Sequence, residues 1–219
     1  MNERTQNRLF AAFGVGSVVV ELAAVAIGAA GGRQFATIGT SPAGVAKAVT
    51  DHAGTAVWIS AYLEIVSFGL FLAFAMWACT RLGGGILGDL GRAAATAYAA
   101  VSIVSLGLGD AIAYRSGKGM DLQLASTLFT LNEALFVCTW FLSVFFLLAV
   151  APLAFLSGRR ALGYGAVGVA LVTLVTTALS VDNVAQLANM LWLAWIVWAS
   201  VALARGVRQR SAATEVAIA

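Results

Sequence analysis

Residues 122–156 read LQLASTLFTLNEALFVCTWFLSVFFLLAVAPLAFL, a nearly unbroken apolar run. The hydrocarbon core of a bilayer is about 30 Å thick and is crossed by about 20 helical residues. This run is longer than one crossing, so the helix that it predicts must tilt, break near Pro152 or protrude from the membrane. The stretch indicates a chain that folds in lipid.

The composition extends this interpretation to the whole chain. Of the 219 residues, 61% are hydrophobic and 11% are charged, whereas soluble domains are about one-quarter charged. Each span with its turn takes about 30 to 35 residues. We therefore expect an all-α polytopic transmembrane helix bundle with six spans, as a single domain over residues 1–210 followed by a polar tail at 211–219. The predicted spans cover residues 9–30, 55–79, 93–114, 122–150, 161–181 and 184–204.

The lysines and arginines predict the orientation of this bundle. In a six-span arrangement nine of them fall on one side and four on the other. Because positive residues favour the cytoplasmic side, we expect both termini in the cytoplasm and a multi-pass protein of the cell inner (plasma) membrane. The basic residues lie at the ends of apolar runs, so the net charge of +3 indicates topology and no nucleic-acid partner.

Single-residue counts exclude several kinds of cofactor site. The one histidine, His52, cannot supply the paired ligands of a membrane b-type cytochrome. Lys47 and Lys118 fall in polar connections, which excludes a retinal Schiff base inside a span. Cys79 and Cys138 lack C-x-x-C spacing and are typical of small packing residues. We expect no metal and no cofactor.

The longest polar connection covers residues 33–54 and contains Ser41-Pro42. Serine followed by proline is typical of an N-cap and a first helical position. A short interfacial helix is therefore expected in this connection.

Several acidic residues lie in apolar segments, where a charged side chain has a high free-energy cost. Five of the ten are in or at the ends of predicted spans, namely Glu21, Glu64, Asp110, Glu133 and Asp182. A charged side chain at the bilayer centre costs about 2.5 to 3.5 kcal/mol on insertion scales, so acids without basic partners in the spans need a shared polar cavity or bound protons. All five map to the outer half or the middle of their spans. We expect an acidic cavity that opens away from the cytoplasm.

Helical spacing gives these acids polar and aromatic neighbours. The stripe on the second span comprises Ser60, Glu64, Ser67, Phe68 and Phe71. The stripe on the fourth comprises Phe129, Glu133, Phe136 and Trp140. The remaining pairs and runs are Ser17 with Glu21, Asp110 with Tyr114, and Asp182 with Gln186 and Asn189. A carboxylate bordered by ring faces suits a cation, because both attract positive charge.

Each of these residues also has a structural interpretation. A protonated acid can hydrogen-bond to a neighbouring helix, and Gln186 and Asn189 can hold helices together in the same way. Asp182 is also typical of a turn. The six tryptophans are more typical of interfacial belts or packing than of ligand contacts.

Two stretches resemble known membrane proteins. They are YLEIVSFGLFLAFAMWACTRL at 62–82 and LNEALFVCTWFLSVFFLLAVAPLAFLSGRRALGYGAVGVALV at 131–172. They resemble small bacterial multi-span membrane proteins of unknown function, in which a glutamate early in the second span recurs. More remotely, the chain is similar to integral membrane terpene cyclases. This resemblance implies that Glu64 takes the place of their early acid and Asp182 that of their late one. Those cyclases usually have seven spans, and six are expected here.

Three functions are compatible with these features. The leading hypothesis is a membrane enzyme that performs acid/base chemistry on a lipophilic, isoprenoid-like substrate. A terpene cyclase or an isomerase would be an enzyme of this kind. The expected catalytic residues are Glu64, Glu133 and Asp182. The expected substrate-binding residues are Glu21, Asp110, Phe68, Phe71, Phe129, Phe136, Trp140, Tyr114, Gln186 and Asn189. The alternatives are a small proton- or cation-coupled transporter and an accessory protein in which the acids are structural. The expected partners are membrane lipids and a lipophilic small molecule.

Overall fold

The computed structural model describes residues 2–31, 41, 43–44, 54–116, 118–179 and 182–218. Within these residues six helices are long and apolar enough to cross a membrane. They are α1 (Glu3–Ala30), α3 (Thr55–Leu82), α4 (Gly85–Ser116), α5 (Leu122–Leu156), α6 (Arg160–Leu179) and α7 (Asp182–Ile218). The predicted helix bundle with six apolar helices is confirmed.

Several helices extend beyond the predicted spans. Helix α1 begins at Glu3, where the Asn2 side chain caps it by accepting a 2.9 Å hydrogen bond from the Thr5 N–H. Helix α5 continues through Pro152 to Leu156, so the long apolar run does not end at its proline. Helix α7 continues to Ile218, and the backbone of the predicted polar tail is helical as far as that residue.

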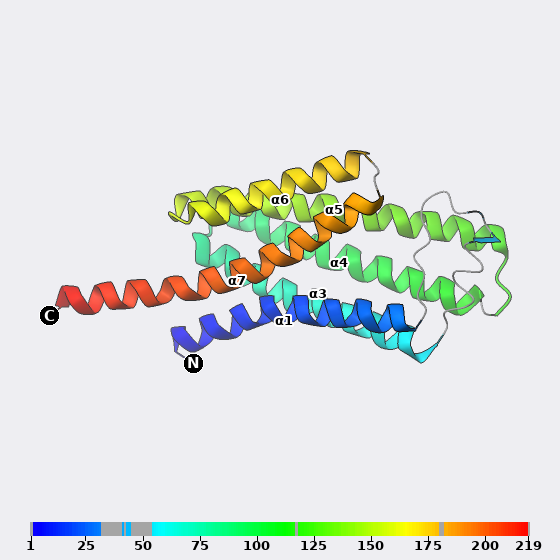
Figure 1. The fold of residues 1–219 in the computed structure, drawn as a ribbon, viewed down its shortest axis with the longest axis horizontal. Helices are drawn as coiled ribbons and strands as arrows, with labels where there is room; N and C mark the ends of the chain where they lie inside the picture. Colours follow the sequence, from blue (N-terminus) through cyan, green and yellow to red (C-terminus); the bar gives the residue numbers. More distant parts are fainter. Residues whose placement is uncertain are drawn as a thin grey trace.

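The six helices form a closed ring. Each of these helices packs against the next one along the chain, and α1 also packs against α7. Figure 1 shows that the two chain termini lie at the same end of the bundle, as an even number of spans requires. We call this end the basic end, because the side chains of seven arginines gather there, namely Arg4, Arg8, Arg81, Arg92, Arg159, Arg160 and Arg205. The opposite end is the far end.

Glycine permits two features of this ring. At the basic end, Gly83, Gly84 and Gly85 all have positive φ, at 141°, 65° and 66°, a conformation that other residues rarely adopt. They form the tight turn between α3 and α4. In α1, a Cβ on Gly14 would lie 2.1 Å from the Ser200 Oγ of α7 and 2.7 Å from the Phe74 ring of α3. Glycine at this position therefore lets three helices approach one another.

The packed core is concentrated in the half of the bundle near the basic end. The large, fully buried side chains there include Phe74, Phe146, Leu147, Ile196 and Leu203. Towards the far end, the buried apolar residues include several alanines, namely Ala24, Ala61, Ala125 and Ala188, together with larger side chains such as Ile112. The acids that the sequence singles out lie near the middle of the helices or towards the far end.

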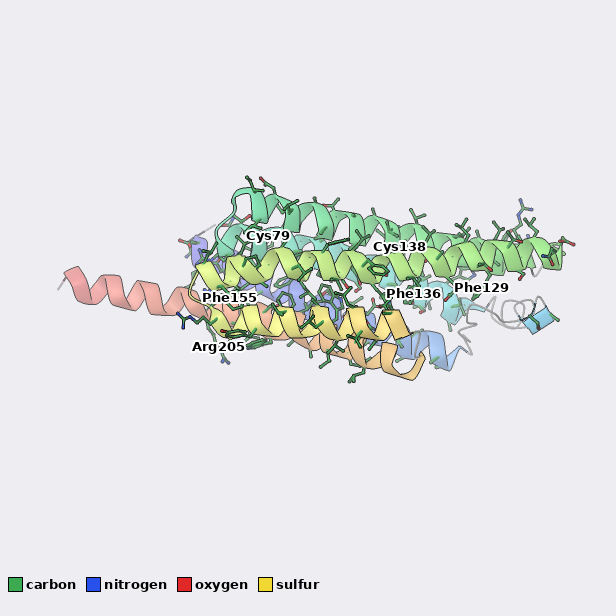
Figure 2. All side chains as sticks on the ribbon, turned by 90° about the horizontal axis from the view of Figure 1, so that it is seen from above. Cys79, Phe129, Phe136, Cys138, Phe155 and Arg205 are labelled. Atoms are coloured by element: carbon green, nitrogen blue, oxygen red, sulfur yellow. The ribbon has the colours of Figure 1, made fainter. Side chains whose placement is uncertain are left out.

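The bundle is uneven at its far end. Helices α4 and α5 pack along each other and extend past the ends of α1 and α6 (Figure 1). Seen from above in Figure 2, the part of α5 that carries Phe129 lies beyond the end of α6. Helix α5 does not end at Pro152, and how the long apolar run lies in a membrane, tilted or protruding, stays a prediction.

The connection before α3 is described only in part. The Ser41 Oγ accepts a 3.2 Å hydrogen bond from the Gly44 N–H, as expected for an N-cap. The rest of the predicted interfacial helix, with Lys47 and His52, lies outside the described residues.

Candidate functional site

A group of aromatic rings from four helices lies at the centre of the bundle. The Phe71 ring of α3 is 5.2 Å from Tyr98 of α4, 5.6 Å from Phe146 of α5 and 5.4 Å from Trp192 of α7. Trp192 also stacks on Trp195 at 6.1 Å. We call Phe71, Tyr98, Phe146, Trp192 and Trp195 the aromatic cluster. Four of its members, Phe71, Phe146, Trp192 and Trp195, belong to the buried apolar core, and Tyr98 packs against that core.

Tyr98 is the polar member of this cluster. Its side chain interacts with those of Trp192 and of Ser102, one turn further along α4, and the charge of the Glu21 carboxylate acts on it electrostatically. The Oε2 atom of Glu21 is buried. The fold therefore couples a buried acid of α1 electrostatically to a phenol of α4 that lies among aromatic rings.

A hydrogen bond between α1 and α3 shows the depth of two acids. The Ser60 Oγ of α3 lies 2.8 Å from the Ala24 carbonyl oxygen of α1 and 3.2 Å from the Glu64 Oε1. Glu21 lies three residues before Ala24, and Glu64 lies four residues after Ser60. Because the two helices are antiparallel, both acids lie about one helical turn closer to the basic end than this contact. Glu21 and Glu64 are thus at a similar depth on adjacent helices.

The stripe predicted around Glu64 lies largely inside the bundle. Ser60, Ser67 and Phe71 are buried, and Glu64 and Phe68 are partly buried. Phe68 reaches Tyr98, with their ring centroids 6.0 Å apart. This face of α3 therefore points towards the aromatic cluster.

The stripe predicted around Glu133 is divided. Glu133, Phe129 and Trp140 are partly buried, whereas the Phe136 side chain is 49% exposed. Phe136 packs edge-on against Trp140 at 5.8 Å. Figure 2 shows Phe129 and Phe136 along α5, with Phe129 on the part that protrudes. The aromatic part of this stripe lies apart from the cluster.

Next to Glu133, a polar contact joins α4 and α5. The Ser105 Oγ donates a 2.9 Å hydrogen bond to the Asn132 Oδ1. A Cβ on Gly109 would also lie 3.6 Å from the Asn132 side chain. Asn132 thus holds the two protruding helices together, as polar residues do between membrane helices.

The other predicted site residues lie towards the far end. Asp110 is partly buried, and Tyr114 is exposed. The Tyr114 hydroxyl is 2.6 Å from the Lys118 Nζ. Asp182 begins α7, but its side chain and that of Gln186 are outside the described part of the structure. Asn189 is exposed.

Metal binding is not indicated by the described residues. Among them, no three His, Cys, Asp or Glu side chains are grouped as metal ligands. Cys79 is buried and Cys138 is exposed, and neither forms a disulfide.

Two surface hollows lie at the basic end. One lies beside the α3 to α4 turn and is lined by Arg81, Leu153 and Ser157 among others, and a second adjoins Arg159 and Trp198. The acidic cavity expected to open at the far end stays a prediction.

No protein-family model, curated protein or solved structure matches the chain. The two resemblances expected from the sequence therefore stay predictions. Function has to be inferred from the geometry.

Reasoning from the sequence missed two kinds of site residue. Tyr98 is not acidic and lies on no predicted stripe, and Trp192, like the other tryptophans, is typical of interfacial belts or packing. The stretch ATAYAAV at 95–101 holds a signal that could have found Tyr98, since a buried tyrosine hydroxyl usually has a partner. The partner itself, on another helix, could not be identified without the fold.

Proposed function

We propose that this chain is a multi-pass enzyme of the cell inner membrane that performs acid/base chemistry on a lipophilic, isoprenoid-like substrate. The observation that carries the proposal is the buried Glu21 carboxylate, whose charge acts on the Tyr98 side chain of the aromatic cluster. A proton donor beside ring faces is the combination that makes and then stabilises a carbocation.

The reaction would be an isomerisation or a cyclisation, because protons are neither gained nor lost overall. A protonated carboxyl would transfer its proton to one carbon of an alkene, forming a C–H bond and leaving a cation on the other carbon. The ring faces of Phe71 and Trp192 would stabilise that cation. A second carboxylate would then remove a proton from a neighbouring carbon, which restores a double bond. Glu21 and Glu64, at a similar depth on α1 and α3, supply the two acids.

Reaction in D₂O tests this proposal directly. Chain purified into nanodiscs is incubated in D₂O with polyprenyl alcohols or with a total lipid extract of the host cells, and the lipids are analysed by mass spectrometry. An enzyme of this kind incorporates deuterium at carbon, because the transferred proton comes from solvent. We expect loss of incorporation in Glu21→Gln and a large decrease in Tyr98→Phe.

A matched control is available at the surface. Glu3 is an exposed acid that pairs with Arg81 at the basic end, and Glu3→Gln should leave deuterium incorporation unchanged. Incorporation that is equal in wild type and Glu21→Gln would overturn the assignment of Glu21. No incorporation from any lipid by folded wild-type chain would overturn the enzyme.

A second candidate function rests on a different observation. Two carboxylates at a similar depth, with the Ser60 hydroxyl 3.2 Å from the Glu64 Oε1, also suit a site for a proton or an organic cation in a transporter. Proteoliposomes with an internal pH dye distinguish the two candidates. A transporter moves protons in response to an imposed cation gradient and catalyses no deuterium incorporation.

A further inference from the structure

The hollow between α6 and α7 at the basic end has a basic lining. It includes Arg159, Arg160, Leu162, Trp198 and Ala202, and no acidic residue lines it. Its volume is about 380 Å³, the space of about a dozen water molecules at about 30 Å³ each. This is enough for a phosphodiester and the glycerol attached to it.

The first arginine is held in place by the fold. Arg159 follows the end of α5, and its Nη1 donates a 2.8 Å hydrogen bond to the Ala202 carbonyl oxygen of α7. This bond joins the α5 to α6 turn to α7 and orients the Arg159 guanidinium at the hollow. An oriented guanidinium loses less freedom when it binds an anion, and its planar donor set matches phosphate.

The second arginine supplies charge. Arg160 begins α6 and is exposed, and it forms no ion pair with the described residues. The charged side chains around Arg160 at the basic end are also mostly positive. Among the described side chains, the seven arginines of the basic end face two acids, Glu3 and Asp89, and both of these are paired with other arginines.

Trp198 forms an apolar wall of the hollow. A Cβ on Gly165 would lie 2.4 Å from the Trp198 ring, so the indole packs closely against α6. The side chain is still 42% exposed. A tryptophan that is anchored on one face and open on the other is typical of the level at which lipid headgroups meet acyl chains.

We propose that this hollow binds the phosphate of an anionic glycerophospholipid. Arg159 and Arg160 bind the phosphate, and Trp198 and Leu162 contact the glycerol and the first part of an acyl chain. Basic pockets between membrane helices recognise anionic lipids in this way. The apolar wall favours a lipid over free phosphate. The site lies towards the opposite end from the Glu21 carboxylate and does not depend on the proposed enzyme.

Native mass spectrometry of delipidated chain in detergent tests the site. The probes are dioleoyl phosphatidylglycerol, dioleoyl phosphatidylcholine and inorganic phosphate. We expect phosphatidylglycerol to bind in preference to phosphatidylcholine, and millimolar inorganic phosphate to leave the lipid adduct in place. Arg159→Gln with Arg160→Gln should lower the affinity for phosphatidylglycerol roughly a hundredfold, about tenfold for each lost charge-assisted contact.

The matched control is Arg4→Gln with Arg8→Gln, which removes the same charge from exposed positions at the same end. It should retain the phosphatidylglycerol adduct. Arg160→Gln alone leaves the hydrogen bond between Arg159 and Ala202 intact. This single variant should still weaken phosphatidylglycerol binding. It therefore tests the site even if the double variant fails to fold. Equal losses in the two double variants would mean diffuse attraction and overturn the site. Equal binding of the two lipids, or displacement by inorganic phosphate, would also overturn it.

Discussion

The Ser60 hydroxyl of α3 donates a 2.8 Å hydrogen bond to the Ala24 carbonyl oxygen of α1. Both helices are apolar at this level, so the bond helps to fix their relative position along the helix axes. The Ser60 Oγ also lies 3.2 Å from the Glu64 Oε1. The depth at which Glu21 and Glu64 lie follows from this one contact.

Replacement of Ser60 by alanine should lower the free energy of unfolding by about 0.5 to 1.5 kcal/mol, the usual contribution of one buried hydrogen bond. Unfolding in mixed micelles of dodecyl maltoside and SDS measures it. Ser143 is the control, because it is also buried but donates to the Trp140 carbonyl oxygen of its own helix. Ser143→Ala should change the stability by less than about 0.5 kcal/mol. Equal effects would show that the bond between helices contributes nothing.

Gly14→Ala should destabilise the bundle by about 1 to 3 kcal/mol, because the added methyl overpacks the contact. It would meet the Ser200 Oγ and the Phe74 ring, neither of which can move away freely in a packed core. Gly107→Ala is the matched control, since a Cβ there meets nothing within 4 Å. It should stabilise the helix by about 0.5 to 1 kcal/mol. The same unfolding assay would contradict the close approach of α1, α3 and α7 if both alanines stabilised the chain.

A double-mutant cycle tests the polar contact between Asn7 and Trp77. Asn7 is buried, and its Oδ1 accepts a 3.0 Å hydrogen bond from the Trp77 Nε1. Asn7→Ala and Trp77→Phe should show a coupling energy of about 0.5 to 1.5 kcal/mol in the free energy of unfolding. Strictly additive effects would exclude a stabilising bond. The exposed pair of Arg81 and Glu3 nearby should couple by less, about 0.2 to 1 kcal/mol, because solvent screens it.

Labelling of single cysteines tests the predicted orientation. In a Cys138→Ala background, Gln6→Cys reports on the basic end and Lys118→Cys on the far end, and both positions are exposed. The buried Cys79 remains unlabelled. In intact cells a membrane-impermeant maleimide should label Lys118→Cys and not Gln6→Cys, because the basic end is expected in the cytoplasm. The opposite pattern would reverse the bundle, and labelling of both would indicate mixed insertion.

Hydropathy and charge along the chain were enough to predict six apolar helices and the approximate residues at which they begin and end. These are local properties. A run such as 122–156 must be helical in lipid because its backbone polar groups have no other partners, and glycines at 83–85 leave the chain free to turn. Spacing also placed Ser60, Glu64 and Phe71 on one face correctly, since that follows from helical geometry alone.

Only the tertiary structure decided which of these faces meet. The electrostatic coupling of Glu21 with Tyr98, the contact of Ser105 with Asn132, and the aromatic cluster each join residues from different helices. Apolar helices in lipid lack a hydrophobic driving force towards any particular neighbour, so small residues and interhelical hydrogen bonds select the partner. That choice depends on shape complementarity between whole helix surfaces, which no single stretch of sequence contains. The fold class was therefore a local property of this chain, whereas the arrangement around Glu21 was not.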